Sequence, residues 1–264
     1  LAGGTEAMSK APHIAWNMRW GMRFGQDEGL KDSLWEALYD PHAGLKMAET
    51  AEKLGEHYGI TRAECDEYGL RSHQAWVDAH ANGRFAEEIV PVMVKKRREM
   101  VAFEVDEHPR TDADLASMNS LRSIFKKDGL VTAANASGIC DGAAAVVISD
   151  GAAARDRGLK PIARLVGWGI AGCDPTMMGI GPAPAARRAL NDCGMQVGDL
   201  DLVEVNEAFA PQYLAVEKEL GLDRDKTNVD GGAIAIGHPL ACSGTRITLH
   251  LIHELRWRGQ RFGL

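Results

Sequence analysis

From residue 129 onward, the chain alternates short apolar runs with segments of helical periodicity. Such alternation is typical of α/β proteins, in which strands lie between helices. A continuous apolar run such as residues 143–148 predicts a buried strand. The expected strands are residues 143–148, 162–168 and 200–205, and the expected helices are residues 182–193, 207–220 and 239–258. The alternation therefore predicts an α/β fold.

The first half of the chain is more polar, and its pattern is mainly helical. Between residues 46 and 59, apolar residues recur at three- and four-residue spacing, which indicates an amphipathic helix. Thr61 stands three residues before Glu64, a capping-box arrangement that begins a second helix. Residues 89–94 are β-branched but include a proline, so we expect a short edge strand there. The charged residues 95–128 are expected to form a solvated surface.

The amino-acid composition limits which kinds of molecule the protein is expected to bind. The 264 residues include 30 Lys or Arg and 37 Asp or Glu, which gives a formal net charge of -7 at pH 7. A chain without excess positive charge is poorly suited to nucleic acid, and no apolar run approaches the roughly 20 residues of a membrane span. The five cysteines form no CxxC pair, so neither a disulfide framework nor a metal site is expected. We therefore expect a soluble intracellular protein.

Two polar side chains stand where an expected strand passes into a loop or helix, the usual place of ligand sites in α/β folds. His238 lies at the start of the last helix, where free N–H groups and the helix dipole favour negative charge, so a neutral imidazole there could donate to an oxyanion. Asn206 follows the strand at 200–205. Each also has a structural interpretation: His238 as a helix cap or core residue, and Asn206 as a buried amide that ties two loops together.

Four ordered segments carry a resemblance that runs along the whole chain. They are Gly3-Gly-Thr-Glu-Ala-Met-Ser9, Asn135-Ala-Ser-Gly138, Asp201-Leu-Val-Glu-Val-Asn-Glu-Ala-Phe-Ala210 and Gly231-Gly-Ala-Ile-Ala-Ile-Gly-His-Pro-Leu240. With these segments the chain resembles the thiolases, the acetyl-CoA acyltransferase family. Within that family it most resembles the mitochondrial-type 3-ketoacyl-CoA thiolases and their bacterial relatives, through the stretches Asp32-Ser-Leu-Trp35, Phe125-Lys-Lys-Asp-Gly129, Gly179-Ile-Gly-Pro182 and Phe209-Ala-Pro-Gln-Tyr-Leu-Ala-Val-Glu217. Four motifs in order are a far more specific signal than one Gly-rich loop.

The resemblance implies a thiolase fold: two similar α/β halves, each a mixed sheet between helices, with a mostly helical loop domain inserted in the first half. Residues 1–159 would be the remainder of the N-terminal half, including the loop domain at about 10–139. Residues 160–264 would be the C-terminal half. Because the chain begins at Leu1 and stops soon after a charged segment, we expect it to be cut at both ends and its first half to be incomplete.

The resemblance also implies a reaction. Thiolases cleave a 3-ketoacyl-CoA with free CoA, or condense two acetyl-CoA in reverse, through a cysteine acyl-enzyme. By resemblance, His238 raises the reactivity of that cysteine and donates to the thioester oxygen, while Asn206 holds a water that donates to an oxyanion. The nucleophile belongs to a Cys-Gly-Ser-Gly motif and a second, acid/base cysteine to a Cys-Ile-Gly-Gly-Gly motif. Neither motif is present, so the chain as given is expected to be inactive.

The resemblance also implies a set of residues that bind CoA. Arg110 would face the nucleotide end, and Ser137 would bond the pantetheine chain. Phe125 and Phe209 would line the pantetheine tunnel, and Met47 would lie near the acyl end. Three positions depart from the usual residues of the family: Ala113 and Ala134 within this site, and Asp230 outside it. CoA and acyl-CoA would be substrates, with no permanently bound cofactor. Cys242 could be made reactive by the helix dipole, but small-residue packing is the preferred interpretation.

Two other classes of protein are alternatives to a thiolase enzyme. One is a non-catalytic acyl-CoA-binding protein of thiolase fold. The other is a ketosynthase or hydroxymethylglutaryl-CoA synthase of the same superfamily, which the Asn-Glu-Ala-Phe and Gly-His-Pro motifs disfavour. By resemblance, the protein would be a homodimer or homotetramer in the bacterial cytoplasm or the mitochondrial matrix, without a nucleic-acid or membrane partner.

Overall fold

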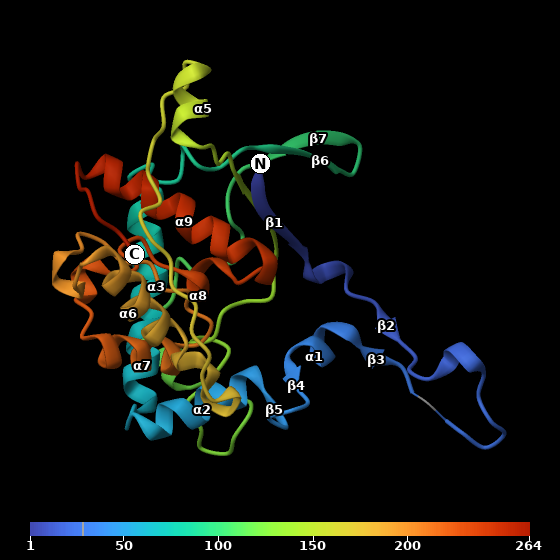
Figure 1. Cartoon of the computed structure of the whole chain (residues 1–264). Helices are drawn as coiled ribbons and strands as arrows, with labels where there is room; N and C mark the ends of the chain where they lie inside the picture. Colours follow the sequence, from blue (N-terminus) through green and yellow to red (C-terminus); the bar gives the residue numbers. More distant parts are fainter. Residues whose placement is uncertain (28) are drawn as a thin grey trace.

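The computed structural model describes residues 1–27 and 29–264. Most of the regular structure of these residues is helical, and the strands that they form pair two by two (Figure 1). The helices are α1 (Ser33–Ala37), α2 (Met47–His57), α3 (Arg62–Ala81), α4 (Leu115–Asn119), α5 (Gly151–Asp156), α6 (Pro182–Cys193), α7 (Ala210–Leu220), α8 (Ala233–Ile236) and α9 (Leu240–Trp257). The strands are β1 (Ala2–Ala7), β2 (His13–Ile14), β3 (Lys31–Asp32), β4 (Tyr39–Asp40), β5 (Leu45–Lys46), β6 (Val92–Lys96), β7 (Glu99–Phe103) and β8 (Asp141–Val146). Short 3-10 helices lie at η1 (Met8–Lys10), η2 (Met18–Trp20), η3 (Pro175–Ile180), η4 (Val197–Asp199) and η5 (Arg224–Lys226).

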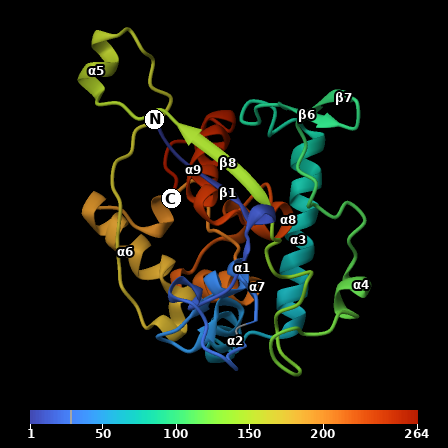
Figure 2. The same ribbon diagram turned by 90° about the vertical axis from the view of Figure 1, so that its right-hand side faces the viewer.

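The first and last strands form one antiparallel ladder although they lie far apart in the sequence. β1 pairs with β8, with Thr5 opposite Ala143. Helix α9 packs against both strands (Figure 2). Gly4 permits this close approach, because a Cβ on Gly4 would overlap the carbonyl oxygen of Ala241. The ladder therefore fixes the first turn of α9, directly after His238.

The predicted helices are confirmed. Thr61 N donates to Glu64 Oε2 at 2.7 Å, and Glu64 N donates to Thr61 Oγ1 at 3.2 Å, so the capping box begins α3 as expected. Gly59, at φ +62°, supplies the left-handed turn after α2. Residues 182–193 and 239–258 correspond to α6 and α9, and the helix expected at 207–220 is α7, which begins three residues later than expected.

The main hydrophobic core joins helices from both ends of the chain. Leu54 of α2 and Tyr68 of α3 pack with Tyr213 of α7 and Ile234 of α8. The rings of Tyr68 and Tyr213 are stacked with centroids 4.0 Å apart, a contact that contributes about 1 kcal/mol beyond the apolar area it buries. The loops that follow residue 205 and residue 228 are therefore fixed against α3.

Three strand predictions need correction. Residues 162–168 form no strand, and residues 200–205 pair only at isolated bridges. The strand expected at 143–148 is β8, in which only alternate residues are sheltered, so it is not a buried strand. A buried strand needs hydrogen-bonded neighbours and cover on both faces. Within the described part of the chain, β8 has a single neighbouring strand and residues 162–168 have none.

The charged segment 95–128 is more ordered than predicted. The expected edge strand begins later, as β6, and pairs with β7 in a hairpin that projects from the body in both views (Figures 1 and 2). The next helix, α4, carries Met118, which is buried. The prediction of a solvated surface is therefore correct for the hairpin and for most of α4, and wrong for Met118, the one buried residue of that helix.

All five cysteines are free thiols, of which Cys65 and Cys242 are buried and Cys173 is exposed. Among residues 1–27 and 29–264, no helix is long and apolar enough to span a membrane. The same residues contain no group of His, Cys, Asp or Glu side chains that could hold a metal ion.

A buried charge cluster ties α9 to the turn before β6 and to the loop before α8. His250 Nδ1 lies 2.8 Å from Glu88 Oε1, and His250 Nε2 lies 3.6 Å from Asp230 Oδ2. Burial by itself lowers the pKa of His250. The hydrogen bond to Glu88 and the charges of Glu204 and Glu88 outweigh burial and the opposing charge of Arg246, and raise the pKa to about 9. His250 is therefore a cation in the folded protein at neutral pH.

This cluster predicts loss of stability at alkaline pH. The pKa of His250 is raised from 6.5 in the unfolded chain to about 9 in the folded protein, so its stabilisation is complete below pH 6.5 and is lost as pH rises through about 9. We expect urea denaturation to show that the free energy of unfolding falls by on the order of 3 kcal/mol between these two pH values. The free energy of unfolding of His250→Gln should not show this fall with pH, and the exposed His42→Gln should behave as the parent. An equal difference between parent and His250→Gln at pH 6 and pH 10 would contradict the prediction.

Candidate functional site

His238 and Asn206 lie side by side where three loops meet. Asn206 Nδ2 is 3.3 Å from His238 Nε2. The chain before Asn206 is held by Asn228, whose Oδ1 accepts from Val205 N at 2.8 Å. Gly237, at φ +92°, turns the chain from α8 into His238, and a Cβ at this position would overlap a cysteine side chain. The structure thus brings together the two residues that the sequence marked as catalytic.

The second ring nitrogen of His238 is held by the first turn of α9. His238 Nδ1 lies 2.6 Å from Ser243 Oγ, and Ser243 Oγ donates to the carbonyl oxygen of Pro239 at 3.3 Å. Burial, with the positive charge of Arg246 as a second cause, lowers the pKa of His238. The ring is therefore neutral at pH 7. A neutral imidazole can take a proton from a nucleophile and later return it.

The loop Asn135–Gly138 bonds to His238 and to the segment that follows Asn206. Gly138 O accepts from His238 N at 3.0 Å. Ser137 N and Ser137 Oγ donate to Ala208 O, at 3.0 Å and 2.9 Å. Three of the motifs that the sequence singled out therefore converge on one site through backbone hydrogen bonds.

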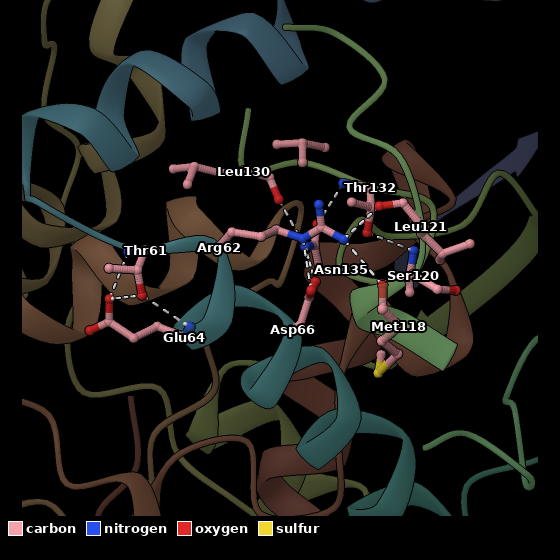
Figure 3. A network of polar contacts seen from close by, with 12 residues as sticks. Thr61, Arg62, Glu64, Asp66, Met118, Ser120, Leu121, Leu130, Thr132 and Asn135 are labelled. Atoms are coloured by element: carbon pink, nitrogen blue, oxygen red, sulfur yellow. Dashed lines mark hydrogen bonds and ion pairs between the residues drawn. The ribbon is translucent and has the colours of Figure 1, made fainter. Parts of the chain in front are cut away.

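Helix α3 anchors this loop, as Figure 3 shows. Asn135 Nδ2 donates to Asp66 Oδ1 at 2.7 Å, and Arg62 Nε donates to Asp66 Oδ2 at 2.7 Å. The same guanidinium group donates to the carbonyl oxygens of Met118 and Leu121. Because Asp66 is fully buried, its carboxyl oxygens depend on these partners for their hydrogen bonds. The capped end of α3 therefore fixes the loop that holds His238.

Glu207, directly after Asn206, joins the loop in front of His238 to α3. Its side chain is fully buried. It accepts hydrogen bonds from Tyr68 Oη at 2.6 Å, Ser72 Oγ at 2.7 Å, Asn228 Nδ2 at 3.1 Å and Ile234 N at 3.1 Å. A Cβ on Gly232 would overlap the Glu207 carboxyl group, so glycine is required there. The sequence reasoning did not single out Glu207, although an acidic residue between two apolar segments was a usable signal.

The aromatic residues expected to line the pantetheine tunnel share one cluster. Phe125 and Phe209 pack against Val131 and against α2, the helix that Met47 begins. The residues that precede Phe125 in the sequence, 121–124, line an open hollow of about 510 Å³ together with Ala133. The structure therefore brings Phe125 and Phe209 together beside α2, the helix that begins at Met47.

The other two expected CoA residues hold loops in place. The hydroxyl of Ser137 donates to a backbone carbonyl, so toward a ligand its oxygen can only accept. Arg110 is exposed, and its backbone N–H donates to His73 Nδ1 at 3.2 Å. Burial, with smaller effects from the charges of His108 and Arg110, lowers the pKa of His73 to about 4, so this ring accepts at neutral pH. Arg110 thus lies at the surface, beside α3.

His108 is a site residue that the sequence reasoning missed. It lies in the segment predicted to be a solvated surface, and no periodicity marked it. Its Nδ1 lies 2.7 Å from Ala235 O and donates to that carbonyl. Its ring fills the space that a Cβ on Gly138 would occupy. His108 therefore braces both the loop that accepts from His238 N and the helix α8 before it.

The cysteines near the site are packing residues. Cys242 is 3% exposed and lies against Gly142, and burial raises the pKa of its thiol despite its place on the first turn of α9. Burial, followed by the charge of Asp106, raises the pKa of Cys140 to about 11. Both thiols are therefore protonated at neutral pH, which favours the packing interpretation of Cys242.

Comparison with known sequences assigns the family. The sequence model of the thiolase N-terminal domain matches residues 1–152, and that of the thiolase C-terminal domain matches residues 159–264. The chain belongs to the thiolase family, and the predicted thiolase fold is confirmed.

Individual relatives match this chain along its whole length. The mitochondrial 3-ketoacyl-CoA thiolase of Bos taurus is 53% identical over 264 residues, which are 100% of this chain and 66% of that protein. The acetyl-CoA acetyltransferase of Chromobacterium violaceum is 48% identical over 265 residues, 100% of this chain and 68% of that protein. The crystal structure of human mitochondrial 3-ketoacyl-CoA thiolase in complex with CoA matches with a TM-score of 0.96 and 53% identity, covering 99% of this chain and 65% of that one. The chain thus spans 66% of the length of the mitochondrial relatives.

Proposed function

We propose that the protein is an acyl-CoA acyltransferase that cleaves 3-ketoacyl-CoA with free CoA, or condenses acetyl-CoA in reverse, through a cysteine acyl-enzyme. The observation that carries the proposal is the pair of His238 and Asn206, 3.3 Å apart, with the loop Asn135–Gly138 bonded to His238 N and to Ala208 O. Support comes from a relative at 53% identity whose structure was solved with CoA. CoA and acyl-CoA are substrates here, and no permanently bound cofactor is proposed.

The chemistry assigns a step to each group. A cysteine thiol gives its proton to His238, and the thiolate attacks the keto carbonyl. The bond between the α- and β-carbons breaks, and a second cysteine protonates the departing acetyl-CoA carbanion. The thiol of CoA then attacks the acyl-enzyme and releases the shortened acyl-CoA. Protonated His238 donates to the oxyanion, as does a water bound by Asn206 Oδ1, a buried atom without a hydrogen-bond partner among the described residues.

None of the five cysteines serves as the nucleophile in this proposal. Burial raises the pKa of Cys65 to about 12 and of Cys140 to about 11, and it also raises that of Cys242. A catalytic thiol needs the opposite shift. Cys173 lies before η3, and Cys193 ends α6. In this proposal the nucleophile and the acid/base cysteine are not among these five cysteines, and the 264 residues alone are expected to show no turnover.

CoA is proposed to lie along the face that carries the aromatic cluster. Phe125 and Phe209 would contact the pantetheine chain, and the oxygen of Ser137 would accept from one of its amide groups. Met47 would lie near the acyl group. Arg110 would meet a phosphate at the nucleotide end, where a guanidinium group is well suited.

The experiment uses the protein at the length at which it occurs in the cell. We expect thiolysis of acetoacetyl-CoA by CoA, measured as loss of the 3-ketothioester absorbance and blocked by iodoacetamide. Titration calorimetry with CoA provides an independent measure of binding. Binding without turnover would support the non-catalytic acyl-CoA-binding alternative, and absence of both would refute acyl-CoA as the ligand.

We also propose a homo-oligomer, a dimer or tetramer, in the bacterial cytoplasm or the mitochondrial matrix. The segment that carries β2 and η2 projects from the body in Figure 1. It exposes Trp16, Trp20 and Phe24, with Trp20 92% exposed. Clustered exposed aromatic residues are typical of a surface that a protein partner covers.

The oligomer proposal predicts a mass that depends on this segment. Light scattering of the protein at its natural length is expected to give the mass of a dimer or tetramer. The double variant Trp20→Ser with Phe24→Ser should shift the equilibrium toward smaller species, because it removes the apolar area buried by association. A monomer for the parent at micromolar concentration would contradict the proposal.

A further inference from the structure

The hydrogen bonds of Ser243 bear on which nitrogen of His238 carries the proton. Ser243 Oγ lies 3.3 Å from Pro239 O, a carbonyl oxygen that can only accept, so the hydroxyl proton can be donated there. The oxygen of Ser243 then presents a lone pair to His238 Nδ1, 2.6 Å away. In this arrangement Nδ1 carries a proton. In the neutral ring, Nε2 is the unprotonated nitrogen.

The opposite side of the ring specifies the same tautomer. Asn206 Nδ2 is a donor and lies 3.3 Å from His238 Nε2, so it can bond only an unprotonated Nε2. In the reverse arrangement, with Ser243 donating to Nδ1, Pro239 O would keep the backbone N–H groups of Cys242 and Ser243, at 2.8 Å and 3.1 Å. That arrangement would, however, direct the Nε2 proton at the Asn206 amide protons. The contact from Asn206 therefore selects the arrangement in which Ser243 accepts.

We propose that Ser243 is a positioning residue that holds His238 in the Nδ1–H tautomer and so makes Nε2 the basic nitrogen of the site. The catalytic part of this inference rests on the proposed function. In that function, Nε2 takes the thiol proton and, once protonated, is the nitrogen that donates to the oxyanion. Ser243 is 4% exposed and acts through the ring of His238. Its place is set by the fold, because its hydroxyl bonds back to the residue four positions earlier at the start of α9.

The test reads the tautomer directly. The protein at its natural length is labelled with ¹⁵N in histidine only, and the His238 signals are identified by their loss in His238→Asn. At pH 8, two-dimensional ¹H–¹⁵N spectra of the ring are expected to show a protonated Nδ1 and an unprotonated Nε2. Ser243→Ala should raise the population of the Nε2–H tautomer, because the acceptor for the Nδ1 proton is lost.

Activity provides the second readout. Ser243→Ala is expected to lower kcat about tenfold, the factor that one net hydrogen bond supplies, with KM for acyl-CoA unchanged. Ser243→Thr keeps the hydroxyl and should restore both the spectrum and kcat. The matched control is Thr248→Ala on the same helix, whose hydroxyl donates to Gly244 O at 2.8 Å and which should change neither readout.

Two results would overturn the proposal: a protonated Nε2 in the parent protein, or an unchanged tautomer in a folded Ser243→Ala variant. The spectra do not depend on turnover. If the protein shows no acyl transfer, the proposed function fails, while the spectra still decide whether Ser243 sets the tautomer.

Discussion

Replacing His238 with alanine is expected to lower kcat/KM for acetoacetyl-CoA thiolysis by about 10³-fold or more. The variant loses the base that takes the thiol proton, a role that contributes roughly 10²- to 10⁴-fold. It also loses one oxyanion donor, whose removal costs about 10²- to 10³-fold in other enzymes. The effects overlap, because one side chain performs both roles in sequence. The measurement is steady-state thiolysis with the protein at its natural length.

The control for this prediction lies on α9. His253→Ala removes another partly buried imidazole, whose Nδ1 faces Glu87 at 3.7 Å. It is expected to leave kcat/KM within about twofold, because His253 lies ten residues after Ser243 on the same helix, about 15 Å along the helix axis. CoA affinity of His238→Ala, measured by calorimetry, should remain near that of the parent. Thiolysis by His238→Ala within tenfold of the parent would remove His238 from the proposed mechanism.

The parts of the site that the sequence predicted are those carried by short motifs at the ends of apolar runs. His238 and Asn206 were identified because each follows such a run, and the structure places them 3.3 Å apart. The helices were predictable from local signals as well, such as the capping box of Thr61 and Glu64. In both cases the decisive information lies within a few residues of the chain.

The remaining parts depend on contacts between distant residues. Glu207 meets Tyr68 across 139 positions, and His108 meets Ala235 across 127 positions. No periodicity encodes such contacts. The strand predictions at 162–168 and 200–205 failed for a related reason, because apolar character predicts burial while pairing requires a neighbouring strand at the right register. Ser243 escaped notice because a serine on a helix has no distinctive pattern.

Replacing Glu207 with alanine is expected to be the most destabilising single change in the site. The side chain accepts from Tyr68 Oη, Ser72 Oγ, Asn228 Nδ2 and Ile234 N, all at 3.1 Å or less. A buried donor without an acceptor costs about 1–3 kcal/mol. We therefore expect a loss of about 4 kcal/mol or more in the free energy of unfolding, a large part of the 5–15 kcal/mol typical of a whole protein. Urea denaturation measures this loss.

A surface carboxyl group on α7 provides the matched control. Glu219 accepts from Arg187 Nη1 at 2.7 Å and from Tyr58 Oη at 2.8 Å, but its side chain is 31% exposed. Water can replace these bonds, so Glu219→Ala is expected to cost about 1 kcal/mol or less. Glu207→Gln should fall between the two, because the amide keeps the size of the side chain but presents a donor where an acceptor is needed.

The double variant separates the cost of unpaired donors from a general loss of packing. If orphaned donors cause the loss, Tyr68→Phe should recover part of it in the Glu207→Ala background, because no unpaired hydroxyl then remains against the cavity. In the parent background, the same Tyr68→Phe change should destabilise, because it removes the bond at 2.6 Å. This reversal of sign is a coupling that two independent sites do not show. Additive free energies for the two substitutions would instead attribute the role of Glu207 to volume alone.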